Sequence, residues 1–131
     1  MKAYWDSGAL VQSTGDLQLR TRLRKERGFT RTHALAETFS ALTGGRLAIR
    51  LDAEAAAEMV GNLASDLDFI DLTAEEVLSV LKQAQKRGVR GGRVHDYLHA
   101  VAADKCRAGE LLTTDQYDFQ GLADSATIAV V

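Results

Sequence analysis

The stretch Tyr4-Trp5-Asp6-Ser7 indicates the fold, because it contains a short apolar run that is followed at once by an acidic residue, Asp6. Residues 3–6 predict a short strand, and the run Leu111-Leu112-Thr113-Thr114-Asp115 repeats the pattern near the other end of the chain. Each run places an aspartate at or just after the carboxyl end of a predicted strand. Ligands of parallel sheets bind beyond these ends, so Asp6 and Asp115 are candidate site residues.

Helical segments separate the apolar runs. Helices are predicted over 17–27, 33–43, 53–64, 73–86 and 94–108, a turn or short helix over 7–14, and further strands over 68–72 and 128–131. Asp16 and Asp52 are expected N-caps, Thr73 and Glu76 have the spacing of a capping box, and Gly28 is expected to end the first long helix. Strands alternating with helices indicate an α/β fold, a three-layer α/β/α domain with a short central parallel sheet. We expect one domain over residues 1–131.

Composition narrows the class of protein. With 46% hydrophobic and 26% charged residues, the chain is expected to fold and not to be disordered. Its single cysteine, Cys106, cannot form an internal disulfide. The N-terminus reaches Asp6 too early for a secretory signal peptide, and no apolar run approaches the roughly 20 residues of a membrane span. We therefore expect a soluble, cytoplasmic protein with no membrane contact.

The basic residues form two groups, although the formal net charge is only −2. The first group contains Arg20, Arg22, Arg24, Lys25, Arg27 and Arg31, and the second contains Lys82, Lys86, Arg87, Arg90 and Arg93. Two interpretations stay open: the groups are solvated helix ends, or they flank an acidic cleft and hold phosphates there.

Glu37 stands out within the predicted helix over 33–43. Its neighbours one turn away on either side are Ala34 and Ala41, so its face of the helix is small and apolar. A carboxylate buried there needs a cation or hydrogen bonds to compensate it. The alternative is that Glu37 lies at a solvated edge or pairs with an arginine.

Asp96 resembles Glu37, because it shares its helix face with Ala100 and Ala103. Its alternative role is a favourable charge in the first helical turn. Asp6 and Asp115 can likewise be simple caps of the segments that follow them.

The four acids Asp6, Glu37, Asp96 and Asp115 are more informative together. Parallel topology can bring them to one end of the sheet, where they would repel each other and raise each other's pKa unless cations intervene. Oxygen ligands without a predicted His/Cys cluster favour Mg²⁺ or Mn²⁺ over Zn²⁺. Such ions support hydrolysis of a phosphodiester.

The whole chain resembles the PIN-domain family, and within it the VapC-type ribonuclease toxins. The matching segments are Tyr4-Trp5-Asp6-Ser7, residues 32–42 (THALAETFSAL), residues 91–98 (GGRVHDYL) and Leu111-Leu112-Thr113-Thr114-Asp115, followed by Phe119. The resemblance implies a metal-dependent endoribonuclease that cuts single-stranded or structured RNA with Mg²⁺ or Mn²⁺. It also implies a homodimer, a small antitoxin partner and a role as the toxin of a toxin–antitoxin pair.

The resemblance assigns the family's acidic residues to Asp6, Glu37, Asp96 and Asp115, with Thr113 hydrogen-bonding a carboxylate. There are departures from the family pattern. Gly8 stands where many relatives have asparagine, and Asp118 competes with Asp115 for the fourth acidic position. His99 is not a usual family residue, and we interpret it as pocket lining without a catalytic role.

Two alternative functions remain at this point. The first is a non-catalytic PIN-like module that binds RNA or a partner protein. The second is a receiver-like phosphotransfer domain, which Asp71 near the end of a predicted strand keeps open.

Overall fold

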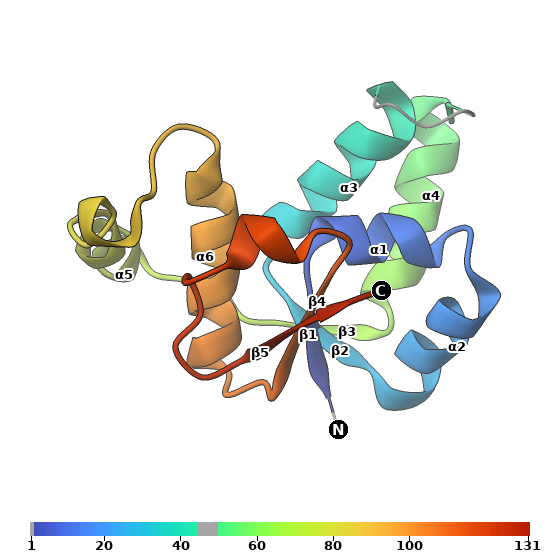
Figure 1. Cartoon of the computed structure of the whole chain (residues 1–131). Helices are drawn as coiled ribbons and strands as arrows, with labels where there is room; N and C mark the ends of the chain where they lie inside the picture. The colour runs from blue at the N-terminus through green and yellow to red at the C-terminus, as the bar shows by residue number, and fades with distance from the viewer. Residues whose placement is uncertain (1, 45–49) are drawn as a thin grey trace.

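The computed structural model describes residues 2–44 and 50–131 and contains a parallel sheet in which five strands follow the order β3-β2-β1-β4-β5 (Figure 1). The strands are β1 (Ala3–Trp5), β2 (Gly28–Thr30), β3 (Leu67–Phe69), β4 (Glu110–Thr113) and β5 (Thr127–Val130). All described strand pairs are parallel. Receiver domains have the strand order 2-1-3-4-5, so this topology argues against the receiver-like alternative.

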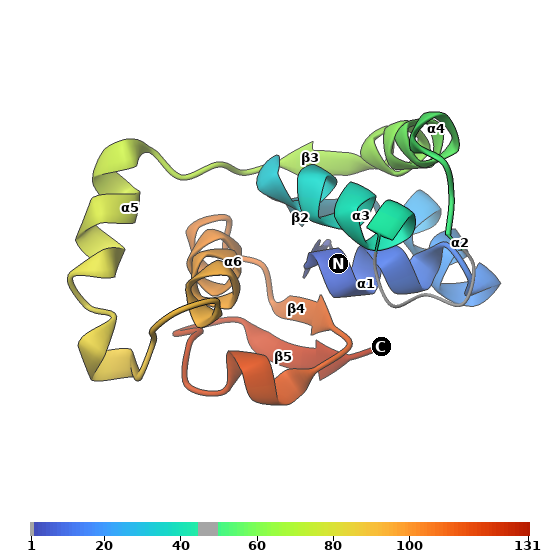
Figure 2. The same ribbon diagram turned by 90° about the horizontal axis from the view of Figure 1, so that it is seen from above.

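Helices cover both faces of the sheet, which confirms the predicted three-layer α/β/α fold (Figures 1 and 2). They are α1 (Ser7–Ser13), α2 (Leu17–Glu26), α3 (His33–Gly44), α4 (Ala53–Ala64), α5 (Ala74–Leu81) and α6 (Arg93–Lys105), with short 3₁₀ turns η1 (Gln85–Arg87) and η2 (Gln116–Phe119). Helix α6 lies on one side of the sheet, and α1 and α2 lie on the other (Figure 2).

The alternation of side chains along β1 builds two separate cores. Tyr4 points into the core beneath α6 together with Leu111, whereas Trp5 and Leu112 point into the core beneath α1 and α2. Successive residues of a strand face opposite sides of the sheet, so a run that is apolar throughout indicates burial on both faces. Burial on both faces holds the central strand β1 rigidly, and it therefore fixes the position of Asp6, the residue that follows it.

Strand β2 was not predicted, and its first residue explains why. The preceding helix ends at Glu26, its C-cap Arg27 has a φ of +58°, and Gly28 is already part of the sheet. A Cβ atom placed on Gly28 would lie 2.5 Å from Cδ1 of Trp5. The helix thus ends at Arg27-Gly28 as predicted, but glycine is needed there to accommodate the indole of the neighbouring strand and not to supply a left-handed backbone.

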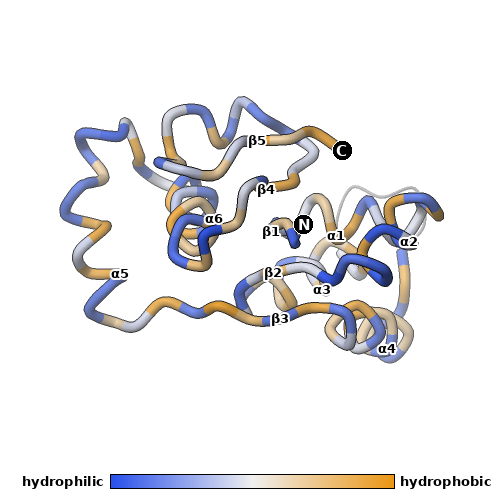
Figure 3. Tube along the Cα trace, turned by 90° about the horizontal axis from the view of Figure 1, so that it is seen from below, coloured by the Kyte–Doolittle hydropathy of each residue, from blue (hydrophilic) through white to orange (hydrophobic). Residues whose placement is uncertain are grey.

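Helix α5 lies apart from the sheet, on the far side of α6 (Figure 2). The predicted capping box of Thr73 and Glu76 is present, but the predicted helix over 73–86 ends at Leu81 and gives way to η1. Apolar and polar residues alternate along this segment (Figure 3). Lys105 holds the segment to α6, because its ammonium group donates a hydrogen bond to Glu76 at 2.6 Å. Among the residues that the structure describes, no helix is long and apolar enough to cross a membrane.

Candidate active site

Three helices begin at the carboxyl edge of the sheet and direct acidic residues to the same place. Helices α1 and α3 follow β1 and β2, and α6 runs back toward the start of β4, so all three have their N-termini at this edge. Asp6 caps α1, Glu37 lies in the second turn of α3, and Asp96 lies in the first turn of α6. The edge also contains the topological switch point between β1 and β4, where ligands of open α/β sheets bind.

Asp6 is buried and held in one orientation. Its side chain is 6% exposed, and its Oδ1 accepts a hydrogen bond from the backbone N–H of Ala9 at 2.7 Å. Burial raises the pKa of Asp6, whereas the hydroxyl of Thr113 and the Ala9 N–H act in the opposite direction. The residue is thus a helix cap, as the simpler interpretation expected, and also a desolvated carboxylate that a cation would stabilise.

Glu37 is positioned by a chain of buried hydrogen bonds. Its Oε1 lies 2.7 Å from Nε2 of His99, and Nδ1 of His99 lies 2.6 Å from the hydroxyl of Tyr4. Burial raises the pKa of Tyr4 well above its ordinary value, so the phenol keeps its proton and donates to Nδ1. His99 is 1% exposed and donates from Nε2 to the carboxylate when it is neutral.

Glu37 therefore has a histidine partner, and no arginine partner occurs among the described residues. Burial alone would raise the pKa of Glu37, but the hydrogen bond with His99 and the nearby imidazoles of His99, His33 and His95 lower it overall. The interpretation of His99 as pocket lining missed this positioning role. The available signal was its spacing, since His99 lies one turn after Asp96 on the same helix.

Asp96 experiences the strongest repulsion from other acids. Its pKa is raised to about 6, first by burial and then by the negative charges of Asp118, Asp6 and Glu37, with His99 acting in the opposite direction. Asp96 is not an N-cap, because the capping position of α6 is Gly92 and has no side-chain hydrogen bond. The fold thus brings several carboxylates close enough to raise the pKa of one of them.

Two exposed aspartates, Asp115 and Asp118, are candidates for the fourth acid of this group. The charge of Asp118 raises the pKa of Asp96 more than that of any other acid. Asp115 is exposed, and its Oδ1 accepts a hydrogen bond from the Tyr117 N–H at 3.0 Å, so it caps η2. Asp118 is thus the aspartate of η2 whose charge acts on Asp96, whereas Asp115 has a capping role.

The loop after β4 also packs closely against the start of α1. A Cβ atom on Gly8 would lie 2.7 Å from Oγ1 of Thr114 and 3.4 Å from Oδ1 of Asp6. A larger residue such as asparagine would displace Thr114, which accounts for the glycine at this position.

The first basic group does not flank this edge of the sheet. The prediction that both basic groups flank the acidic cleft is therefore wrong for this group. Arg20 binds Asp66 at 2.8 Å and Arg22 binds Glu110 at 3.2 Å. Asp66 precedes β3 and Glu110 begins β4, so these contacts lie at the amino ends of the strands. The exception is Arg31, which follows β2 and has Nε and Nη1 buried without a hydrogen-bond partner among the described residues.

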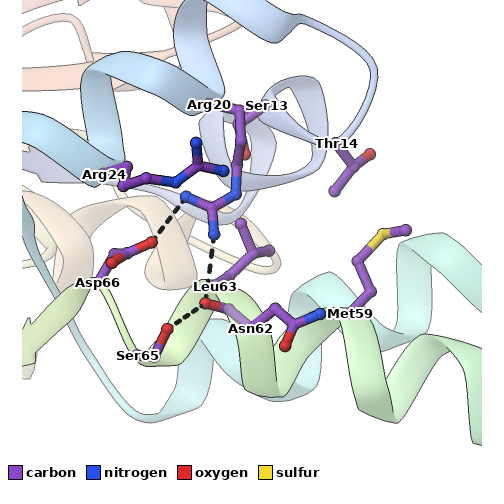
Figure 4. Close-up of a pocket in the computed structure, with 9 residues that line it drawn as sticks. All are labelled: Ser13, Thr14, Arg20, Arg24, Met59, Asn62, Leu63, Ser65 and Asp66. Atoms are coloured by element: carbon purple, nitrogen blue, oxygen red, sulfur yellow. Dashed lines mark hydrogen bonds and ion pairs between the residues drawn. The ribbon is translucent and has the colours of Figure 1, made fainter.

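A surface pocket on this opposite side is lined partly by the same basic group. Figure 4 shows the guanidinium of Arg20 directed at Asp66 and at the backbone carbonyl of Asn62, with Arg24 beside it. The charges of this pocket are thus partly neutralised within the chain. It is separate from the carboxylates at the carboxyl edge.

The second basic group lies on the segment that leads into α6. Arg87 binds Asp124 at 2.6 Å and Arg93 donates to the Gln120 carbonyl at 2.9 Å. The remaining members, Lys82, Lys86 and Arg90, are exposed and form no ion pair within the described part of the chain.

Two further histidines lie beside Glu37, which contradicts the expectation that the site has no histidine cluster. Ligand atoms of His33, Glu37 and His95 all lie within 4.8 Å of one another. The expectation was wrong because His33 and His95 are far apart in sequence and meet only where α3 and α6 begin.

Comparisons with known proteins support the fold. No protein-family model matches the chain, and no curated protein matches its sequence. Among solved structures, the chain is similar to the crystal structure of PAE2754 from Pyrobaculum aerophilum, with a TM-score of 0.72 and 18% sequence identity. The match covers 98% of this chain and 89% of that chain, so the likeness extends over the entire α/β/α domain.

Proposed function

We propose that this chain is an endoribonuclease that cleaves single-stranded RNA with Mg²⁺ or Mn²⁺. The observation that carries the proposal is the convergence of carboxylates at the switch point, where burial, and after it the charges of Asp118, Asp6 and Glu37, raise the pKa of Asp96 to about 6. The sequence resemblance to PIN-domain nucleases supports the same function.

The carboxylates fit a divalent cation on electrostatic grounds. Asp6 is buried without a basic partner in an ion pair among the described residues, and Asp96 is repelled by three other acids. A bound Mg²⁺ or Mn²⁺ would relieve this repulsion, and both ions prefer oxygen ligands. The residues that would hold it are Asp6, Glu37, Asp96 and Asp118.

The protein groups contribute orientation and charge. When bound, the ion supplies Lewis-acid activation of water and of the phosphodiester. The Ala9 N–H orients Asp6, and the His99–Tyr4 pair orients Glu37, so neither carboxylate has to be reorganised during the reaction. The exposed cations Lys82, Lys86 and Arg90 would attract the RNA backbone.

A cleavage assay with purified protein tests the proposal. RNA without stable secondary structure should be cut in Mn²⁺ and left intact in EDTA. Asp96→Asn and Asp118→Asn should each lower the rate by more than about a hundredfold, equivalent to about 3 kcal/mol of transition-state stabilisation.

Asp115→Asn is the matched control. Asparagine caps helices as well as aspartate does, so the variant should keep η2 intact and retain most of the activity. Cleavage that survives EDTA in full, or an Asp115→Asn variant as inactive as Asp118→Asn, would count against the assignment of the site.

The resemblance to VapC-type toxins extends the proposal to the role of the protein in the cell. We infer that the protein acts in the cytoplasm as a homodimeric toxin that a small antitoxin neutralises. Expression of the wild-type chain alone should stop growth, and expression of Asp96→Asn should not. Normal growth with abundant, folded wild-type protein would refute the toxin function but leave the nuclease chemistry to the assay above.

A non-catalytic module that binds RNA or a partner is the remaining alternative. No feature of the described residues favours it over the nuclease. It predicts RNA binding that is equal in wild type and Asp96→Asn and no cleavage by either protein.

A further inference from the structure

Two histidines and one glutamate form a second cluster beside the acidic residues. His33 and Glu37 are one helical turn apart on the same face of α3, and His95 is the third residue of α6. Their ligand atoms all lie within 4.8 Å of one another, and the two imidazole rings are stacked with centroids 5.6 Å apart and planes inclined by 17°.

The two imidazoles are available to a ligand. Both His33 and His95 are exposed, and all histidine side-chain hydrogen bonds in the described part of the chain belong to His99. Exposed rings reorient at little cost in free energy. Tetrahedral Zn²⁺ with metal–ligand bonds of about 2.05 Å holds its ligand atoms about 3.4 Å apart. Small rotations of the side chains are therefore sufficient to close the cluster around an ion.

We propose that His33, Glu37 and His95 form a binding site for a divalent transition-metal ion of the Zn²⁺ type. Two imidazoles and a carboxylate are a common Zn²⁺ ligand set, and the fourth position stays open to solvent or to another ligand. Nitrogen ligands favour Zn²⁺ and Co²⁺ over Mg²⁺, and Zn²⁺ binds such sites more tightly than Mn²⁺ does. The chemistry of this cluster thus differs from that of the four carboxylates.

Glu37 belongs to both sites, and this sharing couples them. A Zn²⁺ ion on the two histidines recruits the Glu37 carboxylate and adds positive charge next to Asp96 and Asp6, so it weakens binding of Mn²⁺ to the acids. If the proposed ribonuclease function holds, on which this step rests, Zn²⁺ inhibits cleavage. The histidine pair then acts as an inhibitory metal site.

Metal titration of tag-free protein tests the site directly. Co²⁺ should give ligand-field absorption that saturates at one equivalent, and Zn²⁺ should displace it. His33→Ala and His95→Ala should each weaken Zn²⁺ binding by more than about tenfold, since each removes one of three protein ligands. Thermal unfolding of both variants checks that they remain folded.

Asp118→Asn is the matched control, because it removes a carboxylate of the acidic site and leaves the histidine cluster complete. Its Zn²⁺ affinity should stay within about threefold of wild type, whereas its Mn²⁺ affinity falls. Equal Zn²⁺ affinity of wild type and a folded His33→Ala/His95→Ala double variant would overturn the proposal. So would wild-type protein that binds no Zn²⁺ at about 100 µM, a concentration far above the dissociation constants of protein Zn²⁺ sites.

The cleavage assay then separates the two proposals. Zn²⁺ should inhibit the Mn²⁺-dependent activity of wild type and inhibit the His95→Ala variant much less. If no cleavage is seen under any condition but Co²⁺ binds through the histidines, the ribonuclease function fails and the transition-metal site stands.

Discussion

Replacing Asp96 by asparagine should stabilise the metal-free protein near neutral pH. The wild-type carboxyl has its pKa raised from 3.8 to about 6 in the folded chain by burial and by the charges of Asp118, Asp6 and Glu37. On a fully buried group, this shift would correspond to about 3 kcal/mol. Because Asp96 is only half buried, solvent screening reduces the expected gain to about 1 kcal/mol, or about 3 °C in the unfolding midpoint.

The sign of the pH dependence follows from the raised pKa. Below pH 3.8, Asp96 is protonated in both the folded and the unfolded chain, so asparagine and aspartate are equivalent. Between pH 3.8 and about 6, the unfolded chain ionises while the folded chain keeps the proton, and wild type progressively loses stability relative to Asp96→Asn. Above about pH 6 the difference is complete and constant.

Urea unfolding in EDTA at pH 4, 5, 6 and 7.5 measures the effect. Asp118→Asn should show the same trend with a smaller amplitude, since it removes the largest repelling charge. Asp115→Asn should show none of it, because asparagine preserves the cap of η2. A difference between wild type and Asp96→Asn that does not change with pH, or a less stable Asp96→Asn at pH 7.5, would refute the argument that the acids repel one another.

Three further predictions concern the sheet, the buried hydrogen bonds and the metal. Gly28→Ala should destabilise the protein by about 2 kcal/mol in urea unfolding, because the new methyl group collides with Trp5, whereas Gly61→Ala, in open space within α4, should stabilise it by about 0.5–1 kcal/mol. Tyr4→Phe should cost about 1–3 kcal/mol, because Nδ1 of buried His99 loses its partner, and an unchanged unfolding midpoint would contradict that hydrogen bond. Mn²⁺ at a hundred times its dissociation constant should stabilise wild type by about 2.7 kcal/mol in calorimetry, and chelation should remove all of this gain.

Local patterns in the sequence were sufficient to predict most of the fold. The caps at Asp16, Asp52 and Thr73 are present where expected, because capping depends on a side chain and the backbone N–H groups within the next turn. The apolar runs predicted β1 and β4, since burial on both faces removes polar residues from a central strand. Strand β2 escaped prediction because its three residues begin with Gly28, whose role depends on Trp5 in a neighbouring strand.

Which residues make up the site depends more on tertiary structure than the fold does. The sequence alone determined that Asp6 ends an apolar strand and that Glu37 and Asp96 lie on helix faces of small residues. Only the fold decided that the charge of Asp118 acts on Asp96 while Asp115 caps η2, because the geometry of this 3₁₀ turn fixes the positions of both aspartates. Only the fold, likewise, brought His33 and His95 to Glu37 and placed His99 between Glu37 and Tyr4, since parallel topology collects residues more than sixty positions apart at one edge of the sheet.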